Sequence, residues 1–394
     1  MRRDPDVLVI GGGIVGLFCA YYLCAAGRSV VVVDRATIGG PQACSYGNTG
    51  FVGTQGAMPF AGPFDAVRED HEIGAWLAHF RRAANAAGGF QALLELKRRS
   101  FEILRTLCAT GSLASVFSAA GVVLAFKTAQ AMERVGRAGI PMRVLTPRDL
   151  LALEPEVDFD VHGALYNADG GMVHSSGFVV EFARILRDMG VEMHEYTEVT
   201  GFDVARDAVT RVHTSRGAFR PHETVVAAGA WSARCAGMLG VGLALQPVKG
   251  YTVTVKTPQR APRHPVLLSE GHVAVAPLGD RLRFGGFMEL AGWDETVSPR
   301  GVDHILDTVR SYLPGLESTE TIEVWTGWRP STPDSLPFLG RAAPYRNVSF
   351  SSGHGHIGMG TAPASGRLIA QLLAGVPPDM PLEPFRLDRF GGRR

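Results

Sequence analysis

Apolar residues first gather at positions 7–10, in a short run that ends at Gly11. An uninterrupted apolar run of this kind predicts a strand that is buried on both faces of a parallel sheet. Residues 14–26 are compatible with a helix that stops at Gly27, and a second apolar strand follows at 30–33. The order strand, helix, strand predicts a βαβ unit at the start of the chain.

The link between the first strand and the helix matches the glycine pattern G-x-G-x-x-G. Gly11 allows a tight turn, Gly13 lets the backbone approach a pyrophosphate, and Gly16 lets the helix lie close to the sheet. Asp34 ends the second strand, where a carboxylate accepts hydrogen bonds from ribose hydroxyls, and the adjacent Arg35 is interpreted as a loop residue. The predicted nucleotide-binding residues of this unit are Gly11, Gly13, Ile14, Val15, Gly16, Asp34 and Arg35. The motif predicts a dinucleotide but does not choose between NAD and FAD.

Helical and strand patterns alternate along the middle of the chain. Residues from about 65 to 110 carry apolar residues at helical spacing, and a second helix is predicted at 178–189 with Ser176 as its cap. From 245 to about 325 apolar and polar residues alternate as in an antiparallel sheet, with a helix at about 302–313. The short strands predicted between these regions lie at 191–196, 199–204, 209–214 and 222–228. With no internal repeat and no low-complexity linker, the second domain is predicted to be inserted into the first.

A second glycine cluster, near the C-terminus, favours one nucleotide over the other. A predicted strand at 347–352 leads into a Gly-x-Gly-x-x-Gly segment at 353–358, and a helix follows from about 364 to 373. A second dinucleotide site would need another strand that ends in an acid, but residues 375–378 are Gly-Val-Pro-Pro. The glycines therefore offer bare backbone N–H groups at a helix N-terminus, which suits an anion. Because a reduced flavin carries negative charge over its N1–C2 carbonyl edge and nicotinamide does not, the cluster favours FAD over NAD.

Composition and charge narrow the class of protein. The 394 residues are 46% hydrophobic and 20% charged with a net charge of +1, which fits a folded two-domain protein and offers no field for nucleic acid. Five scattered cysteines without a Cys-x-x-Cys pair argue against a disulfide framework and a zinc site, so we expect no metal and a reducing, cytoplasmic location. The apolar start of the chain is interrupted by glycines, unlike a signal peptide.

Arginines gather near the C-terminus, at Arg386, Arg389, Arg393 and Arg394. The simplest interpretation is a solvated tail. The alternative is peripheral contact with an anionic membrane surface, here the inner face of the cytoplasmic membrane.

Several further segments resemble the D-amino acid oxidase superfamily of FAD-dependent oxidoreductases. They are the polar loop 45–48 (Ser-Tyr-Gly-Asn), the small-residue strand end at 225–231, the segments 247–251 (Pro-Val-Lys-Gly-Tyr) and 327–334 (Gly-Trp-Arg-Pro-Ser-Thr-Pro-Asp), and the glycines at 353–360. With the N-terminal unit, the resemblance covers essentially the whole chain. Within the superfamily, the D-amino acid dehydrogenases and hydroxyproline-type dehydrogenases are the most similar. Two residues depart from the pattern, because His174 replaces an expected acid and His356 replaces a smaller polar residue.

This resemblance implies an α/β fold, with a glutathione-reductase-type Rossmann FAD domain and an inserted antiparallel-sheet substrate domain. The FAD-binding domain is expected to comprise residues 1–62, 150–242 and 326–394, and the substrate domain residues 63–149 and 243–325. The FAD contacts expected beyond the N-terminal unit are Ser45, Gly47, Asn48, Val199, Ala228, Gly229, Gly353, His354, Gly355, His356, Ile357 and Gly358.

The resemblance also implies roles for three candidate catalytic residues. Arg329 would bind a substrate carboxylate through its planar fork, and the alternative is pairing with Asp334 or a backbone carbonyl. Tyr251 would add a hydroxyl to that carboxylate or cover the pocket, and the alternative is a ring in the core of the sheet. His354 would touch substrate or flavin, as would His356, and the alternative for both is a hydrogen bond to the local backbone.

The predicted activity is the FAD-dependent dehydrogenation of a small amino or imino acid, by hydride transfer from the α-carbon to flavin N5. A D-amino acid, D-proline or hydroxy-D-proline would fit, and the predicted electron acceptor is a quinone or another carrier. Two alternatives stay open: a glycine- or sarcosine-type oxidase that releases hydrogen peroxide, and a flavin electron-relay subunit of a larger complex. Assembly into an oligomer is also left open.

Overall fold

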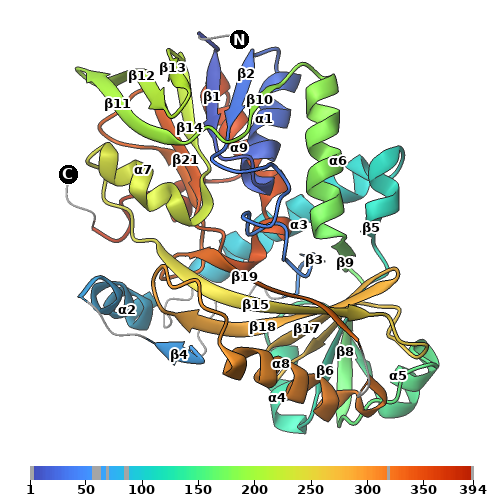
Figure 1. The fold of residues 1–394 in the computed structure, drawn as a ribbon. Helices are drawn as coiled ribbons and strands as arrows, with labels where there is room; N and C mark the ends of the chain where they lie inside the picture. The colour runs from blue at the N-terminus through green and yellow to red at the C-terminus, as the bar shows by residue number, and fades with distance from the viewer. Residues whose placement is uncertain (1–3, 56–63, 68–70, 84–87, 317–319, 392–394) are drawn as a thin grey trace.

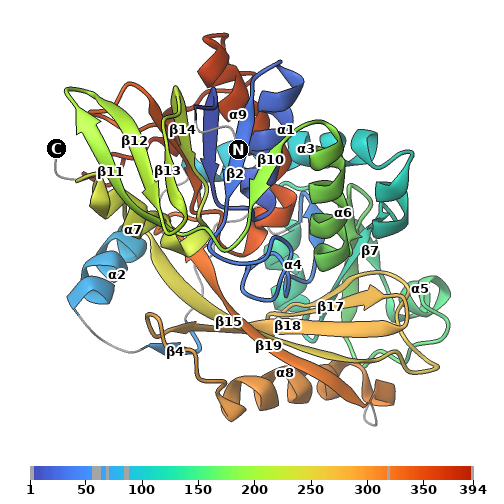
Figure 2. The same ribbon diagram turned by 45° about the horizontal axis from the view of Figure 1, so that its top comes forward.

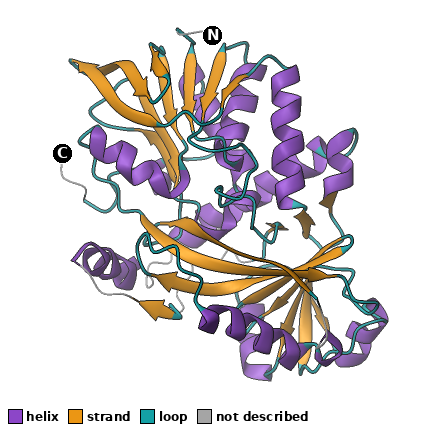
Figure 3. Cartoon of the chain, viewed as in Figure 1, coloured by secondary structure: helices purple, strands orange, loops and turns teal. Residues whose placement is uncertain are grey.

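Two sheets of different construction organise the chain in this computed structural model, which describes residues 4–55, 64–67, 71–83, 88–316 and 320–391. Figure 1 shows a mostly parallel sheet flanked by helices in its upper part, and a long, largely antiparallel sheet below it. Figure 3, coloured by secondary structure, shows that helices pack on the lower side of the large sheet. The predicted α/β fold with a Rossmann unit and an antiparallel sheet is confirmed.

The upper sheet has six strands in the order β10-β2-β1-β14-β21-β20. Neighbouring strands are parallel except β20, which runs antiparallel to β21. The central strands are apolar and fully buried, as expected for strands covered on both faces. Their bounds are β1 Val7–Ile10, β2 Val30–Val33, β10 Glu192–His194, β14 Glu223–Val226, β20 Phe338–Arg341 and β21 Val348–Ser352.

Helices cover the upper sheet and share one hydrophobic core with it (Figure 1). They are α1 Ile14–Ala25, α3 Gly88–Leu107, α6 Ser175–Asp188 and α9 Ala362–Ala374, and the short α7 Ser232–Met238 packs nearby. Where α9 meets α1, Gly366 approaches the backbone of Phe18 so closely that an added Cβ would lie 2.5 Å from its carbonyl carbon. Only glycine allows this contact.

Two small sheets flank the upper sheet. One is the meander β11 Val199–Ala205, β12 Ala208–Thr214 and β13 Gly217–Phe219, which comes forward in Figure 2. The other joins β3 Phe51–Gly53, β9 Gly170–Val173 and β5 Phe117–Ser118. The second sheet connects the segment after the N-terminal unit to the strand that precedes α6.

The large sheet follows the path β19-β15-β18-β17-β16-β6-β8-β7, with β4 beside β18. Residues 301, 305, 309 and 312 place one face of α8 Pro299–Tyr312 against this sheet. The strands are β4 Ala66–Val67, β6 Val122–Phe126, β7 Arg143–Leu145, β8 Gly163–Asn167, β15 Gln246–Lys256, β16 Val266–Leu268, β17 Val273–Leu278, β18 Arg281–Leu290 and β19 Thr321–Ser331. The remaining helices are α2 His71–Ala83, α4 Ala129–Gly136 and α5 Pro147–Leu153, with 3₁₀ turns η1 Ser112–Val116, η2 Gly229–Trp231, η3 Pro314–Leu316, η4 Gly355–Gly360 and η5 Glu383–Phe385.

The cap of α6 differs from the sequence prediction. The helix begins at Ser175, so Ser176 lies inside it and does not cap it. His174 is the cap, and its Nδ1 accepts a hydrogen bond from the Gly177 N–H at 3.2 Å. The histidine that departs from the family pattern therefore uses an unprotonated ring nitrogen as an acid would use an oxygen, and burial lowers its pKa accordingly.

Two segments lie on the other side of the predicted domain boundaries. Helix α3, expected in the substrate domain, packs in the core of the upper part through Leu93, Leu96 and Leu104. Strand β8, expected in the FAD domain, pairs with β6 and β7 in the large sheet. The boundary at residue 325 also shifts, because β19 stays in the large sheet as far as Ser331. Boundaries drawn from motifs miss these exchanges, since pairing and packing partners are distant in sequence.

The C-terminal arginines that the structure describes make internal contacts. Arg389 forms an ion pair with Asp334 at 2.7 Å, and Arg386 pairs with Asp388. Arg393 and Arg394 lie outside the described residues. Within the part of the chain that is described, no helix is long and apolar enough to cross a membrane.

Replacing Gly366 by alanine should destabilise the contact between α1 and α9. The added Cβ would meet backbone atoms of Phe18, and overpacking of this kind costs about 1–3 kcal/mol. Gly74→Ala is the matched control, because its Cβ meets nothing within 4 Å in α2 and should be neutral or stabilise by up to about 1 kcal/mol. Apparent melting temperatures of both variants check this, and a Gly366→Ala protein as stable as the wild type contradicts it.

Candidate functional site

A deep pocket opens at the carboxyl ends of β1, β2 and β14, where the strand order reverses direction. This is the position at which open α/β sheets bind nucleotides. Most of the predicted nucleotide contacts line it, namely Gly11, Gly13, Ile14, Val15, Asp34, Arg35, Ser45, Asn48, Val199, Ala228, Gly229, His354, Gly355 and Gly358. Residues from six separate stretches of sequence therefore meet around one cavity.

The glycine turn and Asp34 form one hydrogen-bonded unit. Asp34 Oδ2 accepts from the Gly12 N–H at 2.7 Å, and its Oδ1 accepts from the Ala36 N–H at 2.8 Å. Burial raises the pKa of this carboxyl, and the two N–H donors oppose that rise. Each oxygen keeps a lone pair for a ribose hydroxyl. Gly16 lines no cavity but packs on the carbonyl of Gly11, where an added Cβ would lie 1.9 Å away.

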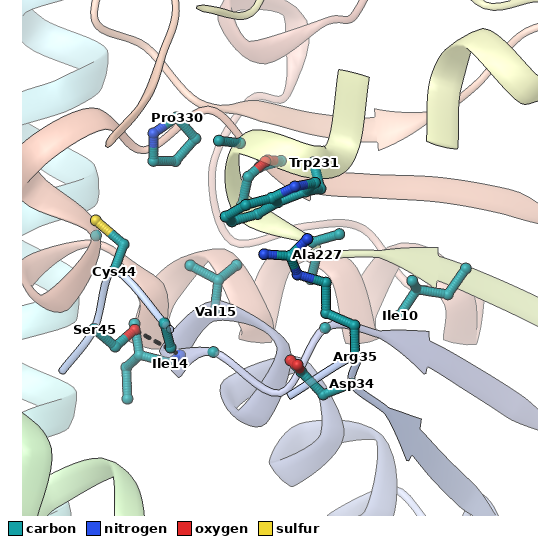
Figure 4. A pocket seen from close by; sticks show the side chains of 18 of the residues that line it. Ile10, Ile14, Val15, Asp34, Arg35, Cys44, Ser45, Ala227, Trp231 and Pro330 are labelled. Carbon is teal, nitrogen blue, oxygen red and sulfur yellow. Dashed lines mark hydrogen bonds between the residues drawn. The ribbon is translucent and has the colours of Figure 1, made fainter. Parts of the chain in front are cut away.

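The N-terminus of α1 points at the pocket, and its first turn contains no charged residue. Gly13 is the N-cap, no acid lies in the first turn, and Ser45 Oγ accepts from the Ile14 N–H at 3.2 Å. Figure 4 shows Ser45 and Ile14 on one side of the pocket, and Arg35 beneath the ring of Trp231 on the other. The Arg35 guanidinium lies 3.8 Å from the centre of that ring, so Arg35 forms a cation–π contact at the pocket rim.

The C-terminal glycines form the 3₁₀ turn η4 and not the first turn of α9, which begins only at Ala362. Gly355 and Gly358 line the nucleotide pocket from this turn, and the helix predicted from about residue 364 follows it as α9. Gly353 does not line the nucleotide pocket and adopts φ +80°, a turn conformation that favours glycine.

One buried polar atom in the wall of the nucleotide pocket, His354 Nδ1, is inaccessible to solvent and has no hydrogen-bond partner among the described residues. Buried polar groups are normally hydrogen-bonded, so this atom suits a polar group of a ligand. With the bare glycine turns and the N-terminus of α1 at the pocket, it fits a dinucleotide.

A second cavity lies next to the first, between the long sheet and the loop at 44–49. Cys44 and Asn48 line both cavities, so the two adjoin at these residues. The walls of the second cavity include Gly250, Gly285 and Gly327 of the large sheet, which leave room for the side chains of Arg329, Thr49 and Trp325. Gly47, His356 and Ile357, predicted as cofactor contacts, face this second cavity.

Arg329 enters the second cavity from β19. Its guanidinium lies across Gly250, where an added Cβ would be 1.6 Å from Nη1, so only glycine leaves room for it. Its Nη1 donates to the Phe287 carbonyl at 3.3 Å, and no carboxylate among the described residues is within ion-pair distance. Asp334, the alternative partner, pairs with Arg389 instead. Burial lowers the pKa of Arg329, as expected for a cation removed from water.

Tyr251 does not reach either cavity. Alternate residues of a strand point to opposite faces, so Gly250 and Thr252 face the second cavity while Tyr251 faces α8. The Tyr251 ring is 0% exposed, and its hydroxyl donates to Glu289 at 2.6 Å. The structure therefore places this residue in the core of the sheet, the alternative to its predicted substrate contact.

The two histidines of the glycine loop face different cavities. His354 is 2% exposed in the nucleotide pocket, with Nε2 3.0 Å from Ser365 Oγ, and burial lowers its pKa to about 3. His356 lines the second cavity, where burial and then the charges of Arg329, Lys97 and His272 lower its pKa to about 3. The buried His354 imidazole is therefore neutral at physiological pH.

Sequence reasoning missed several residues of the two cavities. Trp231 and Trp328 line the nucleotide pocket, and Lys97 and His272 line the second cavity. Lys97 could have been noticed in the sequence, because it occupies a position in the apolar stripe of α3, where a charged residue is unusual. Trp231 and Trp328 lie in the segments 225–231 and 327–334 that carry the family resemblance, whereas His272 shows no local pattern.

Comparison with known proteins agrees with this geometry. The family profile DAO, FAD dependent oxidoreductase, matches residues 6–372. A protein named D-amino acid dehydrogenase from Paramagnetospirillum magneticum is 32% identical, over 98% of this chain and 98% of its own. A protein of the same name from Methylobacterium radiotolerans is 31% identical, over 98% of this chain and 99% of its own.

Solved structures show the same fold. Glycine oxidase from Geobacillus kaustophilus has a TM-score of 0.79 at 25% identity and covers 98% of this chain and 99% of its own. L-proline dehydrogenase from P. horikoshii has a TM-score of 0.77 at 22% identity, with 99% and 98% covered, a likeness that speaks for the fold alone. With a family profile over nearly its whole length and relatives of matching length, the chain belongs to the DAO family of FAD-dependent oxidoreductases, and FAD is its cofactor.

Proposed function

We propose that the chain dehydrogenates a small amino or imino acid in the second cavity, with FAD in the adjoining nucleotide pocket. The observation that carries this proposal is Arg329, a guanidinium without a carboxylate partner among the described residues, in a cavity that adjoins the nucleotide pocket. Relatives named D-amino acid dehydrogenase support the D-configuration, and D-proline or hydroxy-D-proline are included in the proposed substrate class.

The chain's own residues bind and orient the substrate. Bound FAD supplies the oxidising power, by accepting a hydride from the carbon that carries the amine. Arg329 offers parallel N–H donors to the substrate carboxylate, in a site where desolvation strengthens the pairing. Thr252 Oγ1, buried in the cavity wall with no partner among the described residues, provides a further hydrogen bond for the substrate. No nucleophile is required of the protein, so positioning and exclusion of water are its main tasks.

The proposed electron acceptor is a quinone or another carrier, which in the case of a quinone would bring the chain to the inner face of the cytoplasmic membrane. A glycine- or sarcosine-type oxidase is the second candidate, and the similarity to glycine oxidase from Geobacillus kaustophilus supports it. Hydrogen peroxide released in step with substrate consumption would favour the oxidase. Turnover only with an added dye or quinone would favour the dehydrogenase, and no turnover of the isolated chain with any acceptor would favour a relay subunit.

A dye-reduction screen over D- and L-amino acids and prolines tests the proposal as a whole.

Arg329→Met should raise KM steeply while the protein keeps its FAD. Removing one partner of a desolvated charged pair costs about 2–5 kcal/mol, or roughly thirty- to several-thousand-fold in KM. Arg300→Met, on the exposed surface of α8, is the matched control and should keep the KM of the wild type. Steady-state kinetics with a dye acceptor provide the measurement. An Arg329→Met KM within about threefold of wild type would remove Arg329 from the substrate site.

Gly13→Val should weaken FAD binding without unfolding the protein. Gly13 has an extended backbone at φ −71°, and its nearest neighbour to an added Cβ is Ser45 Oγ at 3.7 Å, so the protein tolerates a side chain there. That side chain would enter the nucleotide pocket where the backbone approaches the pyrophosphate. We expect the Kd for FAD to rise about tenfold or more, a loss of one good contact.

Titration of the apoprotein, followed by quenching of flavin fluorescence, gives this Kd, and circular dichroism reports the fold. Gly74→Val, remote from both cavities, is the control. Unchanged FAD affinity in Gly13→Val would show that the turn does not approach the cofactor.

A further inference from the structure

Helix α3 places a lysine where its neighbours are apolar. Lys97 belongs to the buried face that also carries Leu93, Leu96, Ser100 and Leu104. Lys97 is only 3% exposed, and it lines the second cavity together with the glycines of the large sheet. A buried ammonium is costly unless it is paired, so its presence in this face calls for an explanation.

Hydrogen bonds within the protein satisfy Lys97 only in part. Its Nζ donates to the Gln55 carbonyl at 2.6 Å, which uses one of three N–H groups. Among the described residues no carboxylate forms an ion pair with it, and burial lowers its pKa to about 7. An anion bound beside it would restore the charged form and complete its hydrogen bonds.

The chain's other buried lysine shows what a structural lysine looks like in this fold. Lys249 is 1% exposed on the opposite face of the large sheet. It lies 3.2 Å from Glu289 and 3.4 Å from Asp294, and it donates to the Thr296 carbonyl at 3.0 Å. Lys249 is thus fully compensated by the protein, whereas Lys97 lacks a counter-charge and borders a cavity.

The second cavity holds two basic side chains, Arg329 and Lys97, whereas one carboxylate needs only one of them. Among the described lining residues, Asp65 is the one acid, and its Oδ2 already accepts from the Met288 N–H at 2.6 Å. An ordinary α-amino acid brings one carboxylate for Arg329, which leaves Lys97 unmatched.

We propose that Lys97 binds a second acidic group of the substrate, so that the cavity prefers an amino or imino acid with a carboxylate in its side chain. This rests on the proposed function, in which Arg329 takes the α-carboxylate. The second carboxylate accepts the N–H groups that Lys97 does not give to Gln55. A lysine suits this role because its compact, rotatable donors adapt to side chains of different length.

Two other roles for Lys97 make a different prediction. It would act on every amino acid alike if it shared the α-carboxylate with Arg329 or took a proton from the substrate amine. Only the proposed role depends on the side-chain charge of the substrate. Pairs of substrates that differ in that charge alone therefore separate the roles.

The experiment uses the FAD-loaded enzyme and the enantiomer found active in the dye-reduction screen. We expect kcat/KM for glutamate to exceed that for glutamine by about tenfold or more, because a hydrogen bond between two charged groups is stronger than one to a neutral amide. In Lys97→Met this ratio should fall to about one. In Lys256→Met, which removes an exposed lysine at the end of β15, it should stay as in the wild type.

A wild-type ratio of one or less overturns the proposal, and so does a Lys97→Met protein that loses activity on both substrates by the same factor. If Lys97→Met does not fold or retain FAD, binding to the wild type decides. Glutarate should perturb the flavin absorbance at about tenfold lower concentration than its monoamide, and equal affinities overturn the proposal. Because this binding assay needs no turnover, it tests Lys97 even if no amino acid reduces the flavin, the result by which the proposed function itself would fail.

Discussion

One backbone contact links the two parts of the site. Ser331, the last residue of β19, forms an isolated antiparallel bridge with His354 at the start of the glycine turn η4. Arg329 lies on β19 just before this bridge, and Gly355 and Gly358 line the nucleotide pocket just after it. The strand that carries Arg329 is therefore registered against the turn that lines the nucleotide pocket. This fixes the spacing of the two cavities, and a reaction between two bound molecules depends on that spacing.

Glycine is the residue that makes both cavities possible, and it does so for different reasons. In the nucleotide pocket, Gly11 lies so close to the Ala227 carbonyl that an added Cβ would be 2.4 Å away, and Gly13 leaves the approach to the pocket bare. In the second cavity, Gly250 provides the space that the Arg329 guanidinium occupies, and Gly47 does the same for the ring of Trp325. The absence of a side chain at these positions lets backbone meet ligand in one cavity and lets large side chains cross a strand in the other.

Electrostatics distinguish the two cavities as clearly as shape does. The nucleotide pocket combines apolar walls with a few polar groups, and its histidine is neutral because burial holds the pKa of His354 near 3. The second cavity contains the basic side chains of Arg329 and Lys97, with one acid among its described lining residues. Charged groups without partners in a protein interior are costly, and such groups are typical of sites that bind a ligand of opposite charge.

The sequence alone determined the N-terminal Rossmann unit, because this unit depends on local order, and its resemblance to a known family indicated FAD and singled out Arg329. A glycine turn, an apolar strand and a terminal acid act together within a short stretch of chain, and their spacing is visible in the sequence. Tertiary structure decided what depends on which segments meet. The side chain of Tyr251 packs in the core, because alternation along β15 places it on the face of the sheet opposite the second cavity. Lys97 of α3 lines the same cavity as Arg329 of β19. Tertiary packing also stacks Arg35 on Trp231. It places α3 with the upper sheet and β8 in the large sheet, each outside the domain predicted for it. Contacts between segments distant in the chain leave no period or spacing to read, so these parts of the site became visible only in the folded structure.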